Sequence, residues 1–149
     1  MKVRELMTQP AEACEPNSNL ASAAMIMWRN DCGVVPIVSD GRKPVGVITD
    51  RDICMAVATR HVPAEEIRVQ DVMSGDLEFV RADDDVEKAM ESMRRKQLRR
   101  LPVVGKDGRL QGILSLNDIA LSAGQQIAPE EVVTVLKGIC EHRHEAARA

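Results

Sequence analysis

Aromatic residues are almost absent from this chain: its 149 residues include one Trp, one Phe and no Tyr. Proteins that hold single-stranded nucleic acid stack bases on rows of aromatic side chains, which Trp28 and Phe79 alone cannot provide. The formal net charge of −3 gives no overall positive field that would attract nucleic acid or an anionic membrane. We therefore expect no nucleic-acid partner, and we interpret the basic stretch MRRKQLRR at residues 93–100 as a solvated helix face.

Long apolar runs are absent as well. No run approaches the ~20 residues that cross a bilayer, and the N-terminal MKVRELMTQP lacks the apolar centre of a secretory signal. Apolar residues nevertheless make up 44% of the chain, which is enough to form a buried core. These features predict a globular protein of the cytoplasm with no membrane partner.

Motifs for metal binding and catalysis are also missing. The four cysteines, Cys14, Cys32, Cys54 and Cys140, include no CxxC pair and no Cys/His spacing typical of a zinc site. The first three align with apolar residues of an internal repeat, which favours small buried side chains over metal ligands. No nucleophile is placed beside a histidine or another base. The sequence therefore predicts no metal site, no required cofactor and no enzyme activity.

One sequence pattern occurs twice at a distance of 66 residues: residues 36–53 read PIVSDGRKPVGVITDRDI and residues 102–119 read PVVGKDGRLQGILSLNDI. A unit of ~55 residues buries too little surface by itself, so we expect the two copies to pack together about a pseudo-twofold axis. The ungapped shift gives identical pairs that include Glu12/Glu78, Arg29/Arg95, Gly46/Gly112 and Asp52/Asp118. The predicted organisation is a first unit at 1–60, a linker at 61–68, a second unit at 69–123 and a C-terminal extension at 124–149.

Within each unit the pattern predicts a helix, two strands joined by a tight turn, and a second helix. Residues 17–31 have apolar residues at helical spacing behind polar caps at Asn17 and Ser18. Two β-branched runs flank a Ser-Asp-Gly turn over residues 34–48, and Asp-Gly at 107–108 marks the same hairpin in the second unit. The sequence therefore predicts an α/β fold of small sheets covered by helices.

These motifs resemble the CBS domain, the regulatory module named after cystathionine β-synthase. Both units have Met-Thr or Met-Ser near the start, a strand that contains proline, and a G-h-h-[ST]-x-x-D motif in which h is apolar: GVITDRD and GILSLND. The resemblance covers residues 1–60 and 66–123 and implies a tandem CBS pair, also called a Bateman module. Many such pairs bind adenosine-bearing ligands in their clefts. The ligand implied here is AMP, ADP or ATP, with S-adenosylmethionine or NAD as alternatives.

The G-h-h-[ST]-x-x-D motif carries the expected chemistry. Its glycine allows close backbone approach where a side chain would block a ligand, and its hydroxyl residue opens a helix whose N–H groups favour phosphate. The resemblance implies that Thr49 and Ser115 donate to the phosphate and that Asp52 and Asp118 accept hydrogen bonds from ribose hydroxyls. The same spacing is also a capping box, in which these side chains only satisfy helix N–H groups. Both interpretations stay open, and they are compatible.

The resemblance also places adenine between the segment after Met-Thr or Met-Ser and the proline-containing strand, against apolar walls. In the family, a basic residue just before this strand often reaches a phosphate, and here Gly33-Val34 corresponds to Arg99-Arg100. Arg51, which corresponds to Asn117, is a further candidate. The expected binding residues from segments 11–14 and 77–80 and from the two strands are Ala13, Phe79, Val34, Val35, Pro36, Arg99, Arg100, Leu101 and Pro102.

The function predicted from these features is a regulatory module that binds an adenosine-containing nucleotide and controls a client protein in trans. A purely structural or dimerisation module with vestigial pockets is the main alternative. An enzyme that acts on the bound nucleotide is a third hypothesis.

Assembly is predicted from Trp28. Its repeat counterpart is Arg94, so the fold does not require burial at this position, and Trp28, Met25 and Ile26 predict an apolar patch on one helix. The dimers that CBS pairs form through such helices favour a twofold homodimer. The alternative is that an amphipathic C-terminal helix, predicted at 130–145, covers Trp28 in the same chain.

Overall fold

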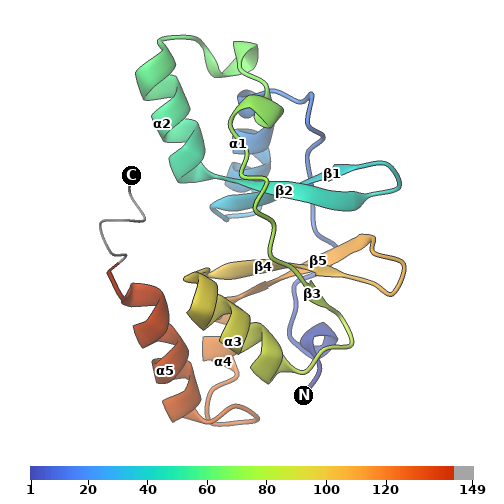
Figure 1. The fold of residues 1–149 in the computed structure, drawn as a ribbon, viewed down its shortest axis with the longest axis vertical. Helices are drawn as coiled ribbons and strands as arrows, with labels where there is room; N and C mark the ends of the chain where they lie inside the picture. Colours follow the sequence, from blue (N-terminus) through green and yellow to red (C-terminus); the bar gives the residue numbers. More distant parts are fainter. Residues whose placement is uncertain (143–149) are drawn as a thin grey trace.

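The structure, a computed structural model, describes residues 1–142 and confirms the predicted fold class of small sheets flanked by helices. The two sheets lie across the middle of the molecule, with α1 and α2 beyond one sheet and α3, α4 and α5 beyond the other (Figure 1). The main elements are α1 (Leu20–Arg29), β1 (Val34–Ser39), β2 (Lys43–Thr49), α2 (Asp50–Arg60), β3 (Val80–Arg81), α3 (Val86–Lys96), β4 (Arg100–Val104), β5 (Leu110–Ser115), α4 (Leu116–Leu121) and α5 (Pro129–Cys140). Single 3₁₀ turns occupy Val3–Glu5, Ala64–Glu66 and Val69–Asp71.

Each unit is built around an antiparallel hairpin. In the first unit β1 pairs with β2, and Val34 lies opposite Thr49. In the second unit β4 pairs with β5, Arg100 lies opposite Ser115, and β3 adds a short parallel strand beside β4. The register is therefore the same in both units, and it places the hydroxyl residue of each motif beside the first residue of the preceding strand.

Apolar residues at strand and helix spacing form a buried core in each unit. Leu20 and Ile48 are fully buried in the first unit, and Met93 and Leu114 are fully buried in the second. Burying one such side chain contributes roughly 1.5–3 kcal/mol, so these residues dominate the stability of each layer. None of the helices within residues 1–142 has the length and apolar composition that crossing a membrane requires.

The N-terminal segment of each unit crosses to the other unit. Thr8 pairs with Ile113 of β5, and the segment then returns to its own unit, where Cys14 pairs with Ile37 of β1. The second unit reciprocates, because Ser74 pairs with Val47 of β2. This exchange of segments ties the two units together about the predicted pseudo-twofold axis.

The motif glycines serve this crossing. A Cβ atom on Gly112 would lie 2.5 Å from the carbonyl oxygen of Thr8, and one on Gly46 would lie 2.6 Å from that of Ser74. Since real Cβ atoms do not approach a backbone oxygen so closely, only glycine fits at either position. The interpretation of these glycines as places for ligand approach is therefore wrong: their close neighbour is the backbone of the other unit.

The C-terminal helix α5 packs on the second unit. Val135 and Ile139 are buried in the core that contains Met93, and the side chain of Arg94 lies against Gly138. Trp28 stays 84% exposed. The alternative in which this helix covers Trp28 is therefore wrong for the described residues, since α5 packs on α3 beside Arg94, the repeat counterpart of Trp28.

Several predicted boundaries are displaced. Helix α1 begins at Leu20, because the side chain of Asn19, rather than Asn17 or Ser18, accepts from the N–H of Ser22 at 2.9 Å. The predicted C-terminal helix at 130–145 ends at Cys140, and its part beyond residue 142 lies outside the described residues.

The segments at 11–14 and 77–80, which we expect to be strands beside the adenine, form only one bridge at Cys14 and the short β3. The first segment divides its hydrogen bonds between the two units.

The four cysteines are free thiols, and they are not uniformly buried. Cys14 is buried and Cys32 is half-buried, whereas Cys54 and Cys140 are exposed. The prediction of a buried Cys54 is wrong because its place on α2 faces a groove that the described part of the chain leaves open.

Candidate functional site

A cavity of about 240 Å³ lies between the two units, and we call it the Ser115 site. Ser115 and Asp118 come from the start of α4, whereas Ala11, Glu12 and Val34 come from the first unit. The crossing of the N-terminal segment assembles this combination, so the motif of one repeat faces the apolar wall of the other. The other lining residues are Thr8, Pro10, Ile26, Asn30, Asp31, Cys32, Arg100, Ile113 and Asn117.

Ser115 and Asp118 form a reciprocal capping box at the start of α4. Asp118 Oδ2 accepts from the N–H of Ser115 at 2.8 Å and from its Oγ at 2.6 Å, and the N–H of Asp118 donates to Ser115 Oγ at 3.2 Å. Asp118 Oδ1 makes none of the hydrogen bonds found among residues 1–142. The capping interpretation is therefore correct, and it leaves one carboxylate oxygen for a ligand hydroxyl.

Thr49 and Asp52 form the same box at the start of α2, with N–H to oxygen distances of 2.9 and 3.1 Å. We call this location the Thr49 site. The bridge between Val47 and Ser74 brings the second crossing segment alongside it, as the bridge at Thr8 does for the Ser115 site. The two sites are therefore built on one plan, and they differ in the side chains around that plan.

The buried positions among the predicted binding residues belong to the core. Val35 and Leu101 are fully buried beneath the helices, and Pro36 and Pro102 are also buried. The carbonyl of Pro36 accepts from the N–H of Cys14 at 3.0 Å, which closes the predicted gap between segment 11–14 and β1. None of these four side chains lines the Ser115 site, so within the described structure they support the wall from behind.

Other predicted residues lie at the surface. Arg51 and Arg99 are exposed, Phe79 is 47% exposed, and none of the three lines the Ser115 site. Ala13 is half-buried beside the core cluster that contains Ala11. Backbone hydrogen bonds in this segment are made by Ala11 and Cys14, whereas none found in residues 1–142 uses the backbone of Glu12 or Ala13.

Arg100 is the basic residue that the structure places at the Ser115 site. It is half-buried, and within the described chain no carboxylate lies close enough to form an ion pair with it. The equivalent position of the first unit is Val34, which lies opposite the hydroxyl motif of its own hairpin. Both Arg100 and Val34 line this cavity, so the two equivalent positions of the repeat meet at one cleft.

Sequence reasoning missed Glu12, which lines the Ser115 site and pairs with Arg29 at 3.1 Å. The same pairing recurs in the second unit, where Glu78 lies 3.7 Å from Arg95 and accepts from Ser92 Oγ at 2.6 Å. The signal was available, because both residues of each pair are identical between repeats. An exposed pair contributes at most about 1 kcal/mol, so its main effect is to orient the segment on the helix.

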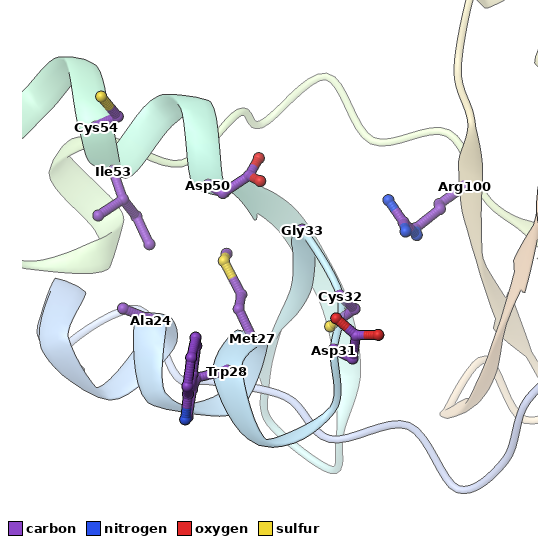
Figure 2. Close-up of a pocket in the computed structure, with 10 residues that line it drawn as sticks. All are labelled: Ala24, Met27, Trp28, Asp31, Cys32, Gly33, Asp50, Ile53, Cys54 and Arg100. Carbon is purple, nitrogen blue, oxygen red and sulfur yellow. The ribbon is translucent and has the colours of Figure 1, made fainter.

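A larger cavity of about 530 Å³ lies between α1 and α2, and we call it the α1–α2 groove. Figure 2 shows Met27 and Trp28 on the α1 side, Ile53 and Cys54 on the α2 side, and Arg100 reaching toward it from the second unit. Three residues line both cavities: Asp31, Cys32 and Arg100. The groove and the Ser115 site are therefore neighbours with a shared wall.

No three His, Cys, Asp or Glu side chains within residues 1–142 are arranged so that they could hold a metal ion. Burial raises the pKa of the Cys14 thiol, and the nearby carboxylate of Glu12 raises it further. A thiol with a raised pKa is a poor nucleophile at neutral pH. Cys14 therefore acts as a packing residue.

Known proteins with similar sequences and structures share this architecture. Protein YhcV of Bacillus subtilis (strain 168), a CBS domain-containing protein, is 31% identical over 141 residues, which cover 92% of this chain and 94% of YhcV.

Two solved structures with similar folds carry bound ligands. The CBS domain pair of protein MJ0100, solved with 5′-methylthioadenosine and S-adenosyl-L-methionine, has a TM-score of 0.72 at 25% identity and covers 81% of this chain and 94% of that chain. The structure of CBSX2 with AMP has a TM-score of 0.69 at 25% identity and covers 83% and 96%.

The sequence model of the CBS domain matches this chain twice, at residues 3–59 and 69–123. These ranges contain both hairpins and both capping boxes, so the match rests on the elements that build the two sites. The chain therefore belongs to the CBS domain family and contains two CBS domains in tandem.

Proposed function

We propose that the protein is a regulatory module that binds an adenosine-containing nucleotide in the Ser115 site. One observation carries the proposal. The cavity between the repeats is lined by the carboxylate of Asp118, by apolar side chains, and by Arg100, which has no ion-pair partner in the described chain. The ligands of two similar structures, AMP for CBSX2 and S-adenosyl-L-methionine with 5′-methylthioadenosine for MJ0100, support the adenosyl class.

Each part of the ligand has a partner of suitable chemistry in this proposal. Asp118 Oδ1 accepts a hydrogen bond from a ribose hydroxyl, and the backbone of Glu12 and Ala13 bonds the adenine edge. Arg100 pairs with the phosphate through a charge-assisted hydrogen bond. AMP, ADP and ATP fit this set, S-adenosylmethionine and NAD remain alternatives, and no further cofactor is required.

The Thr49 site is proposed as the weaker of the two. The repeat exchanges the roles of Arg100 and Val34 between the two sites. At the Thr49 site Arg100 takes the place of the apolar wall residue, and Val34 takes the place of the residue proposed to bind the phosphate. The first residue of α2 is Asp50, where α4 has Leu116, and a carboxylate there repels a phosphate. Arg51 partly offsets this charge from an exposed position.

The proposed output is control of a client protein in trans by a module of the cytoplasm. The free cysteines are compatible with the reducing conditions of that compartment. The exposed patch around Trp28 and Met25 is the proposed contact surface. A second copy of the chain, as the sequence predicted, is one candidate for covering it, and a client protein is the other.

A structural module with vestigial pockets is the competing function. It is supported by the capping boxes, which give Asp52 and Asp118 a role in helix stability without any ligand. In this alternative the crossing segments and α5 exist only to hold two small units together.

Thermal unfolding with AMP, ADP, ATP, S-adenosylmethionine and NAD separates the two functions. A ligand at 100 times its Kd adds about 2.7 kcal/mol to the free energy of unfolding, which raises the Tm of a chain of this size by roughly 5–10 °C. We expect this shift with at least one nucleotide for the wild type and for Asp52→Ala, and a much smaller shift for Asp118→Ala. No shift with any of the five would favour the structural module.

A further inference from the structure

The turns of the two hairpins lie on the same side of the molecule (Figure 1), and Arg42 joins them. The carbonyl oxygen of Arg42 accepts from the N–H of Leu110 at 2.9 Å, and its Nε donates to the carbonyl oxygen of Leu110 at 3.2 Å. Its Nη2 donates to the carbonyl oxygen of Ala11. Because Leu110 begins β5 and Ala11 lies in the N-terminal segment, this one arginine connects three parts of the chain.

The backbone of Arg42 has a left-handed conformation, with φ 66°. This conformation is unfavourable for a residue with a Cβ atom, and it persists where the surrounding contacts hold it. In the second hairpin Arg109 follows Asp107-Gly108 as Arg42 follows Asp40-Gly41, yet Arg109 has an ordinary negative φ. The strained arginine is therefore particular to the first hairpin, where its side chain reaches Ala11.

The contact with Ala11 acts on the Ser115 site, because Ala11 and Glu12 both line that cavity. One peptide unit joins them, and it carries the carbonyl of Ala11 and the N–H of Glu12. A trans peptide unit is planar, so its N–H points in the direction opposite to its carbonyl oxygen. The hydrogen bond from Arg42 to the carbonyl therefore also sets the direction of the Glu12 N–H.

The segment on either side of this peptide unit is held in place. The N–H of Ala11 donates to the carbonyl oxygen of Gln111 at 3.2 Å, and the N–H of Cys14 donates to a carbonyl of β1 at 3.0 Å. Only Glu12 and Ala13 lie between these two anchors. A span this short has few conformations, so a ligand that bonds to its backbone loses little affinity to the ordering of the chain.

We propose that Arg42 is a positioning residue that makes the Ser115 site select adenine over oxo-purines, an inference that rests on the proposed function. Arg42 does not line the cavity and acts through Ala11. It directs the Glu12 N–H at N1 of adenine, which accepts a hydrogen bond. Hypoxanthine has a hydrogen on N1, so a fixed N–H donor disfavours it. Only a peptide unit free to turn could offer its carbonyl to that base.

The Thr49 site has no equivalent contact in the described structure. Leu77 occupies the position of Ala11, and its N–H donates to the carbonyl of Gly75 in its own segment at 3.0 Å. Arg109 Nε donates to the carbonyl of Gly41 at 2.7 Å, and no hydrogen bond found among residues 1–142 joins Arg109 to Leu77. Arg109 is therefore a matched control, because it contacts the other hairpin turn without contacting an adenine segment.

Calorimetric titrations with AMP and inosine monophosphate measure the base preference. The wild type is expected to prefer AMP by about tenfold or more, since one hydrogen bond is made or lost. Arg42→Gly removes the side chain without introducing strain, because glycine adopts a positive φ freely. We expect it to reduce the preference by about threefold or more. Arg42→Lys keeps a donor for one carbonyl and should recover part of the preference, whereas Arg109→Ala should keep all of it.

Amide hydrogen exchange of the ligand-free protein tests the anchor itself. The N–H of Ala11 is expected to exchange about fivefold or more faster in Arg42→Gly than in the wild type. The N–H of Thr8, which donates to the carbonyl of Ile113 at 2.9 Å, is the internal reference and should be unchanged. Equal acceleration at Ala11 and Thr8 would mean that the substitution loosens the whole segment and would overturn the positioning role.

Three binding results would also overturn the proposal: equal affinity of the wild type for the two nucleotides, an unchanged preference in Arg42→Gly, or an equal loss of preference in Arg109→Ala. Failure of the wild type to bind any adenosine compound would instead contradict the proposed function. The exchange rate of Ala11 would then decide by itself whether Arg42 fixes this segment, and an unchanged rate in Arg42→Gly would show that it does not.

Discussion

The two CBS domains share one backbone plan and differ most on the outer faces of their first helices. The stripe on α1 consists of Ala21, Ala24, Met25 and Trp28, and the equivalent stripe on α3 consists of Glu87, Met90, Glu91 and Arg94. Helix α5 packs on the charged stripe of α3, whereas no helix among residues 1–142 packs on the uncharged stripe of α1. The comparison shows that the repeat preserved its core and hairpins while the outer faces of its first helices diverged.

A second difference lies at the cleft between the domains. Arg100 and Val34 occupy equivalent positions, so the Ser115 site has a cation at its proposed phosphate end and the Thr49 site has an apolar residue there. Asp50 in place of Leu116 increases the contrast. Two sites with the same helix cap and the same crossing bridge are thereby expected to differ in their preference for anionic ligands.

The largest expected effect comes from changing the motif glycine that both domains share. Gly112→Ala and Gly46→Ala each direct a methyl group at a backbone oxygen of the other domain, at 2.5 and 2.6 Å. We expect each variant to lower the free energy of unfolding by about 2–3 kcal/mol in urea titrations. Gly75→Ala is the control, because no atom of residues 1–142 lies within 4 Å of its added Cβ. If the two motif variants resemble the control, the domains do not cross as described.

The next effect separates the two ribose positions. Asp118→Ala removes the carboxylate that we propose binds a ribose hydroxyl in the Ser115 site, and a hydrogen bond to a charged group contributes about 1.5–3 kcal/mol. We expect AMP affinity, measured by calorimetry, to fall about 10- to 100-fold. Asp52→Ala removes the equivalent helix cap of α2 and should change the affinity of the main site less than threefold. A larger loss in Asp52→Ala would reverse the assignment of the two sites.

The charge difference at the cleft gives a smaller effect. Arg100→Ala should weaken AMP about tenfold and leave adenosine almost unchanged, because the charge-assisted bond needs a phosphate. Arg99→Ala, which changes the exposed neighbouring arginine, is the matched control. Equal losses for AMP and adenosine would remove Arg100 from the phosphate position.

The smallest effect concerns the N-terminal ends of α1 and α3 at low pH. The pKa of Asp84 is lowered: burial acts to raise it, but the N–H of Arg81 at 2.9 Å and the ammonium of Lys88 at 3.0 Å outweigh burial. A lowered pKa stabilises the folded state above the unfolded pKa of about 4, and this stabilisation is lost as the pH falls through the folded pKa.

Acidification from pH 5 to pH 3 should therefore loosen the first turn of α3 before that of α1, whose cap is the uncharged Asn19. Backbone chemical shifts in the two turns measure this difference. Asp84→Asn should reduce it, and the remainder comes from Asp85, the N-cap of α3, whose pKa is lowered by the hydrogen bond from Lys2. Simultaneous loosening of both turns in the wild type would contradict this account.

Much of each domain could be predicted from the sequence because the determining signals are local. Turn residues located the hairpins, and the spacing of Ser115 and Asp118 located the helix caps. The repeat itself predicted two units of equal architecture. These features depend on residues close in sequence, so a single chain without relatives is enough to find them.

The crossing of the domains was not predictable in the same way. A shift of 66 residues aligns Thr8 with Ser74 but does not say which domain either one contacts, and the choice depends on the closeness of Gly112 and Gly46 to the opposite backbone. The packing of α5 on α3 could not be predicted for a related reason. An apolar stripe that contains Val135 and Ile139 fits either first helix, and only the packed structure distinguishes α3 from α1.

Titration of the wild-type protein with AMP in a calorimeter, with adenosine titrated in parallel, tests the central claim most directly. The difference between the two clefts predicts one tight AMP site per chain, at least tenfold weaker binding of adenosine to it, and a second site that is much weaker or not detected. Two AMP sites of equal affinity, or equal affinity for AMP and adenosine, would contradict the account, since either result would mean that the exchange of Arg100 and Val34 does not distinguish the two domains.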